Sequence, residues 1–164
     1  MLFRSWACAI ERTDGPSSLA LSRQNLPFVK RSPEAIAAIR RGGYVAAEAA
    51  GARAAILATG SEVSIALAAQ QALAAEGIAV RVVSMPCTSV FDRQDAAWRE
   101  SVLPRGLARV AIEAGVTDYW RKYVGLEGMV VGIDRFGESA PAADVYKFLG
   151  VDAAHLAEAV KRLV

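Results

Sequence analysis

The sequence contains only one histidine, His155, and only two cysteines, Cys8 and Cys87, in 164 residues. Structural zinc sites use four ligands drawn mainly from Cys and His, so these three residues are too few for one. A reactive cysteine needs a nearby base, and His155 lies far along the chain from Cys87. We therefore expect both thiols to be reduced and structural, and catalysis by Cys87 is the less favoured alternative.

The sequence also lacks an excess of charge of either sign. Nineteen Lys and Arg residues stand against 17 Asp and Glu residues, which gives a formal net charge of +2. Nucleic-acid-binding domains usually carry a strong basic patch, so the composition does not favour that class. No apolar run approaches the ~20 residues of a membrane-spanning helix, and the apolar start before Glu11 is too short for a secretory signal. We expect a cytoplasmic protein that binds a small anion or another protein.

Glycine-rich phosphate-binding motifs are missing as well. Neither G-x-G-x-x-G nor G-x-x-x-x-G-K-[ST] occurs in the sequence. The chain therefore has no dinucleotide fingerprint and no P-loop, which argues against a free-standing nucleotide-binding protein.

What the sequence has in abundance is hydrophobic patterning, with 54% hydrophobic residues. Strand-like and helix-like patterns alternate, which implies parallel pairing through right-handed crossovers. The predicted fold class is α/β, a mostly parallel (mixed) sheet with helices on both faces in three layers. The predicted strands are residues 18–21, 43–47, 54–58, 80–84, 109–113 and 129–133. The predicted helices are residues 2–11, 33–41, 61–76, 92–102, 142–149 and 152–163, with a turn or helix at 117–123.

A change in pattern divides the chain into three parts. Residues 1–27 contain a helix, a turn and a strand. From Gln24 to Gly43 the regular pattern fades into Asn, Pro, Lys, Arg and Ser, and we predict that residues 28–42 are a linker. Residues 43–164 carry the regular alternation of one α/β domain.

Candidate site residues follow the predicted strands, at the edge where open α/β folds bind ligands. The turn Thr59–Glu62 would offer helix N–H groups to a phosphate, but an ordinary N-cap at Ser61 is the favoured interpretation. Glu113 and Glu138 would form an acid/base pair if the fold brought them together. Capping of the following helix also explains Glu138, and this structural interpretation is the favoured one.

Aromatic residues gather in the segment after residue 116. Tyr119, Trp120 and Tyr123 present more aromatic surface than a short helix easily hides. A protein interface and core packing are both open interpretations.

Arg23 follows the predicted strand 18–21, in the stretch Ser-Arg-Gln-Asn. A lone arginine after a strand is commonly a surface or ion-pair group. Its planar fork, however, suits bidentate phosphate binding, and strand ends face the ligand cleft in α/β folds. On physical grounds the two interpretations are equally weighted.

Six stretches, in order, carry a family resemblance: "DGPSSLALSRQNLP", "RRGGYVAAEAAG", "LATGSEVSIALAAQQALAAEGIAVRVVSMP", "FDRQDAAWRESVLP", "VAIEAGVTDYWRKYVG" and "DRFGESAPAADVYKFLG". Together they closely resemble the C-terminal end of transketolase, from about Trp6 onward. That family, of the pentose phosphate pathway, transfers two-carbon ketol units between sugar phosphates with thiamine diphosphate and a divalent metal such as Mg²⁺, as a homodimer.

The resemblance implies a role for each part of the chain. Residues 1–27 would be the last helix and strand of the pyrimidine-binding domain, residues 28–42 a linker, and residues 43–164 the transketolase C-terminal domain. The arginine of the family's Ser-Arg-Gln stretch contacts the substrate phosphate, which assigns that contact to Arg23.

The departures from the family concern the cofactor. No Gly-Asp-Gly metal motif occurs, because the one Asp-Gly pair, Asp14-Gly15, follows a threonine. The family's pyrimidine-activating glutamate and channel histidines are also missing. We therefore expect no catalytic, cofactor-binding or metal-binding residues and an inactive isolated chain: a truncated product, a partial sequence or one piece of a split enzyme. The alternative is a stable non-catalytic α/β module with a binding or subunit-assembly role.

Overall fold

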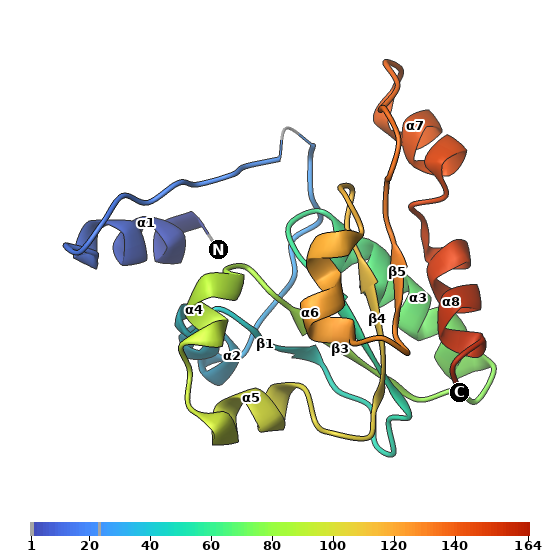
Figure 1. Cartoon of the computed structure of the whole chain (residues 1–164), viewed down its shortest axis with the longest axis horizontal. Helices are drawn as coiled ribbons and strands as arrows, with labels where there is room; N and C mark the ends of the chain where they lie inside the picture. Colours follow the sequence, from blue (N-terminus) through green and yellow to red (C-terminus); the bar gives the residue numbers. More distant parts are fainter. Residues whose placement is uncertain (1, 23) are drawn as a thin grey trace.

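The computed structural model describes residues 2–22 and 24–164. Its described strands form one five-stranded mixed sheet, which lies at the centre of the fold (Figure 1). The strand order is β1-β3-β2-β4-β5. The four strands β2 to β5 are parallel, and β1 runs antiparallel to β3 at one edge. Their bounds are β1 (Tyr44–Ala47), β2 (Ala54–Ala58), β3 (Val80–Ser84), β4 (Ala108–Ile112) and β5 (Met129–Val131). The predicted fold class is confirmed.

The central strand β2 shows why this sequence forms a buried sheet. All five of its residues, AAILA, are fully buried between β3 and β4. A strand covered on both faces needs no polar alternation, and its small alanines let helices approach closely. The continuous apolar run therefore corresponds to the innermost strand.

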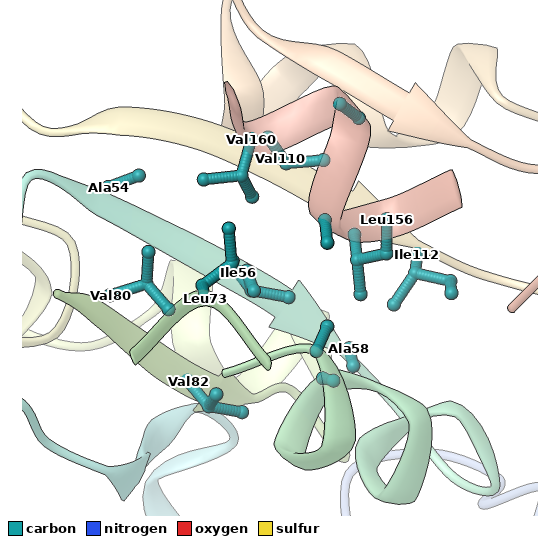
Figure 2. Packing of buried hydrophobic residues seen from close by; sticks show 14 of the residues in the cluster. Ala54, Ile56, Ala58, Leu73, Val80, Val82, Val110, Ile112, Leu156 and Val160 are labelled. Carbon is teal, nitrogen blue, oxygen red and sulfur yellow. The ribbon is translucent and has the colours of Figure 1, made fainter. Parts of the chain in front are cut away.

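Helices cover both faces of the sheet. On one face, α3 (Glu62–Ala75) and α8 (Ala153–Lys161) pack on each other and on the sheet. Figure 2 shows this cluster, in which Ile56, Leu73 and Leu156 are completely buried. The other face packs against the short helices α4 (Thr88–Asp92), α5 (Ala96–Val102) and α6 (Arg121–Val124), the last preceded by the 3-10 turn η2 (Asp118–Trp120). The domain is thus a three-layer sandwich.

One predicted helix begins later than expected. Of the helix expected over residues 92–102, the structure has residues 96–102 as α5, whereas Asp92 is the last residue of the separate helix α4. The Asp95 carboxylate accepts a hydrogen bond from the backbone N–H of Trp98 at 2.7 Å. This N-cap starts a new helix and changes the direction of the chain.

The N-terminal part extends away from the sheet (Figure 1). Helix α1 (Leu2–Glu11) has the predicted bounds, but the strand expected over residues 18–21 is wrong. Those residues form no ladder with any described strand, and Leu21 is 65% exposed. A strand needs a neighbour to take up its main-chain hydrogen bonds, and the described chain supplies none there.

Three further elements complete the fold. Helix α2 (Pro33–Ala38) and the 3-10 turn η1 (Ile39–Arg41) lead into β1, and α7 (Ala142–Leu149) precedes α8. Within the described residues, no helix is both long and apolar enough to cross a membrane.

Candidate functional site at the carboxyl edge of the sheet

The pairing register brings three chain turns to one edge of the sheet. Ala58, at the end of β2, lies opposite Ser84 of β3 and Ile112 of β4. The residues that follow, Thr59, Met85 and Glu113, therefore leave the sheet side by side. After β2 the chain crosses to β3 on one side, whereas β4 lies on the other side of β2. Connections that leave in opposite directions open a crevice, the usual ligand position in such sheets.

That crevice has a volume of 390 Å³. We call it the switch-point crevice. Its lining residues are Thr59, Met85, Pro86, Cys87, Thr88, Glu113, Gly115, Val116, Tyr119 and Trp120.

The turn from β2 into α3 does not have the predicted capping arrangement. Gly60 has φ +53°, a left-handed conformation that glycine adopts at little cost. Ser61 occupies the N-cap position of α3, but its side chain makes no capping hydrogen bond. Its hydroxyl instead donates to Glu62 Oε1 at 3.0 Å. Ser61 therefore has the predicted N-cap position, but it does not form the side-chain capping bond of an ordinary N-cap.

Glu62 is the unexpected residue of this turn. It is only 3% exposed, which is unusual for a carboxylate in the first turn of a helix. Its Oε1 accepts a hydrogen bond from the Tyr146 hydroxyl at 2.6 Å. The N-terminus of α3 favours a negative charge, which helps to offset the cost of burying it.

Tyr146 connects this carboxylate to the N-terminal segment. Its hydroxyl accepts a hydrogen bond from Gln24 Nε2 at 3.1 Å. Burial, and the hydrogen bond to Glu62, raise the pKa of Tyr146, so the phenol stays protonated and donates. A chain of hydrogen bonds therefore runs from α3 through α7 to the residue after Arg23.

Glu113 lies directly after β4 and is partly buried. Burial raises the pKa of Glu113 to about 7, repulsion from Glu62 adds to the increase, and a hydrogen bond from the Ala114 backbone opposes it. The predicted partner Glu138 is exposed and accepts a hydrogen bond from Arg135 Nη2 at 3.1 Å. The carboxyl that acts on Glu113 is therefore that of Glu62, and the Glu113–Glu138 acid/base pair stays a prediction.

The aromatic cluster divides between the core and the crevice. Trp120 and Tyr123 are 3% and 4% exposed and belong to the core. Tyr119 is 55% exposed, and its hydroxyl lies 2.5 Å from Thr88 Oγ1. Core packing thus explains Trp120 and Tyr123, and both Trp120 and the exposed Tyr119 line the switch-point crevice.

Both cysteines are free, and both are exposed. Cys87 lines the crevice, with its Sγ 3.5 Å from Ser89 Oγ. His155 is engaged elsewhere, at the start of α8, where its Nδ1 lies 2.9 Å from Asp152 Oδ1. The structure gives Cys87 no imidazole base.

Arg23, the predicted phosphate ligand, lies outside the described residues. Within the described ranges, no group of three or more His, Cys, Asp or Glu side chains is arranged to hold a metal ion. These residues therefore do not fit a metal-bound diphosphate.

Comparison with known proteins identifies the family. Residues 42–152 match the family model described as "Transketolase-like TK C-terminal domain". The chain belongs to the transketolase family. It is 52% identical over 162 residues to "Transketolase 1" of Escherichia coli (strain K12), covering 98% of this chain and 24% of that transketolase. It is 51% identical over 160 residues to the chromosomal transketolase of Cupriavidus necator, with the same coverage.

Solved transketolase structures agree with the sequence matches. The transketolase of Leishmania mexicana superposes with a TM-score of 0.90 at 39% identity, over 98% of this chain and 23% of that one. A structure described as "Split gene transketolase, inactive beta4 tetramer" gives a TM-score of 0.63 at 28% identity, over 86% of this chain and 47% of that one. The chain thus corresponds to a C-terminal segment and spans about a quarter of the length of its curated transketolase relatives.

The features that the sequence did not reveal are Glu62 and Tyr146. The two side chains are 84 positions apart, and neither has a local pattern that marks it as buried and paired. The position of Thr59 and Glu113 at one edge was predictable, because both directly follow apolar strand patterns.

Proposed function

We propose that this chain acts as the C-terminal part of a transketolase that transfers two-carbon ketol units between sugar phosphates. The observation that carries the proposal is the 52% identity to a transketolase across 98% of the chain. In the complete enzyme, thiamine diphosphate with Mg²⁺ supplies the carbanion chemistry, and the residues that hold them belong to the other domains. The chain alone is inactive under this proposal.

Arg23 is proposed to bind the phosphate group of the sugar substrate. A guanidinium presents two parallel N–H donors that match two phosphate oxygens. The next residue, Gln24, is held by Tyr146, which in turn is held by the buried Glu62. The residue that follows Arg23 in the sequence is therefore tied to the buried start of α3, which supports the proposal.

We further propose the division into three parts predicted from the sequence. Residues 1–27 complete the pyrimidine-binding domain, residues 28–42 are the linker, and residues 43–164 are the C-terminal domain. In support, α1 and the segment after it lie apart from the sheet (Figure 1) and leave Trp6, Ile10 and Leu21 exposed, at 53%, 76% and 65%. The partners under this proposal are the remaining transketolase domains and a second subunit of a homodimer.

The test joins this chain to the preceding three quarters of the E. coli transketolase and measures ketol transfer. We expect the chimera to be active and the 164-residue chain alone to be inactive. In the chimera, Arg23→Ala should raise KM for phosphorylated sugars much more than for unphosphorylated ones. Arg105→Ala is the matched control, because its side chain is 93% exposed. An equal effect of Arg23→Ala on both kinds of sugar would remove Arg23 from the site.

One observation favours the alternative of a non-catalytic assembly module. A structure that resembles this chain at a TM-score of 0.63 is described as an inactive tetramer of a split-gene transketolase. Light scattering on the purified chain distinguishes the two proposals. A stable oligomer that gains no activity when the preceding domains are supplied as a separate chain would favour the assembly role.

A further inference from the structure

The lining of the switch-point crevice is unlike that of a phosphate site. Among the described residues that line it, none is Lys, Arg or His. Its acidic residue is Glu113, and Glu62 acts on Glu113 from the start of α3. An anion placed here would meet the Glu113 carboxylate with no cationic side chain in the lining, so the lining disfavours a sugar phosphate. Its ligand differs in chemistry from the substrate proposed for Arg23.

The apolar and aromatic side chains that line the crevice favour a ligand with a flat apolar surface. Met85 and Trp120 are buried beneath it, and Val116 and Tyr119 are 64% and 55% exposed. The Tyr119 and Trp120 rings meet edge to face, with centroids 6.0 Å apart. Aromatic faces attract cations, and the attraction grows when the cation is partly removed from water.

The crevice has few polar groups, and their oxygen atoms can accept hydrogen bonds from a ligand with N–H donors. Glu113 offers carboxylate oxygens, and Thr59 and Thr88 offer hydroxyls. Thr88 and Tyr119 share a hydrogen bond of 2.5 Å, which holds the tyrosine ring at the rim. A cation beside Glu113 would also relieve the repulsion between Glu113 and Glu62.

We propose that the switch-point crevice binds a small planar organic cation of the amidinium or guanidinium class, with its N–H groups toward Glu113 and its flat face against Tyr119. The crevice volume of 390 Å³ is ample for a single six-membered ring with such a substituent. The proposal stands independently of the transketolase activity, because every residue it uses lies in this chain.

The test is calorimetric titration of the 164-residue chain with benzamidinium chloride at pH 8, with sodium benzoate as the matched anion of the same shape. We expect saturable binding of benzamidinium and no binding of benzoate. In ¹H–¹⁵N spectra, the shifts should concentrate on residues that line the crevice. Glu113→Gln should weaken binding at least about tenfold, since it removes the charge and keeps the shape.

The pH dependence of the affinity for benzamidinium provides a second test. The other titratable groups around Glu113 are Glu62, Cys87 and Tyr119. With the pKa of Glu113 at about 7, its ionised fraction falls from about nine-tenths at pH 8 to about one-tenth at pH 6, so affinity should fall about tenfold.

The control variant is Glu138→Gln, an exposed carboxyl that follows β5 and does not line the crevice. It should bind benzamidinium like the unmodified chain. Equal binding of benzoate, unchanged binding by Glu113→Gln, shifts outside the crevice, or no saturable binding of benzamidinium would each overturn the proposal.

Discussion

Replacing Glu113 by glutamine should make the protein more stable at pH 8 and leave it little changed in weak acid. The pKa of Glu113 is raised from 4.5 to about 7 in the folded chain, so ionisation favours the unfolded state. The folded protein therefore loses stability as pH rises from about 4.5 to about 7, and the full penalty remains above pH 7. Glutamine keeps the shape and removes the penalty.

The size of the stabilisation by Glu113→Gln follows from the raised pKa of Glu113. A difference of about 2.5 pKa units corresponds to about 3.4 kcal/mol at most. The side chain is only partly buried, so solvent screening reduces this to about 1–2 kcal/mol. For a chain of this length, that gain raises Tm by about 2–8 °C.

Thermal and urea unfolding, followed by circular dichroism at pH 5 and pH 8, measure the difference. We expect about 1–2 kcal/mol in favour of Glu113→Gln at pH 8 and less than ~1 kcal/mol at pH 5. Glu138→Gln is the control, because Glu138 is exposed, and it should change stability little at either pH. A Glu113→Gln protein no more stable than the unmodified chain at pH 8 would refute the reasoning, as would a gain of equal size at both pH values.

Two further substitutions test contacts that hold the site in place. Tyr146→Phe removes the 2.6 Å hydrogen bond to the buried Glu62 and should cost about 1–3 kcal/mol of unfolding free energy, measured in urea. It should also speed amide exchange around Gln24, which is hydrogen-bonded to the same hydroxyl. Gly42→Ala should lower Tm strongly, because Gly42 has φ +82° and an added Cβ would lie 2.3 Å from the Cys87 carbonyl oxygen.

Each of these substitutions has a matched control in the chain. Tyr119→Phe removes an exposed hydroxyl and should cost less than ~1 kcal/mol. Gly51→Ala adds a Cβ at φ +69° with no atom within 4 Å, so it carries backbone strain without a clash. If Gly42→Ala and Gly51→Ala lowered Tm equally, close packing at Gly42 would not be the cause. A Tyr146→Phe protein as stable as Tyr119→Phe would show that Glu62 does not depend on the phenol.

The sequence predicted the elements whose signals are local. Strands 54–58 and 80–84 have the predicted bounds, because each is a short apolar run that ends at a change of polarity. Helix 2–11 was equally clear from its single apolar stripe. The break between α4 and α5 also had a local signal, Asp95 before Ala-Ala-Trp, which the helical pattern around it obscured.

Features that depend on distant contacts could not be predicted in this way. A strand over residues 18–21 requires a neighbouring strand, which local patterning cannot supply. The burial of Glu62 depends on Tyr146, 84 positions away. The antiparallel direction of β1 is likewise set by its pairing with β3, not by its own four residues. The cytoplasmic location expected from composition stays a prediction.

The reversed direction of β1 determines at which edge of the sheet the preceding chain enters. Tyr44, the first residue of β1, pairs with Ser84, the last residue of β3. The chain before Tyr44 therefore enters at the carboxyl edge of the parallel strands. Had β1 been parallel, the same preceding chain would have entered at the opposite edge, about 13 Å away across four residues. This single inversion makes the chain enter β1 at the edge of the sheet where the switch-point crevice opens.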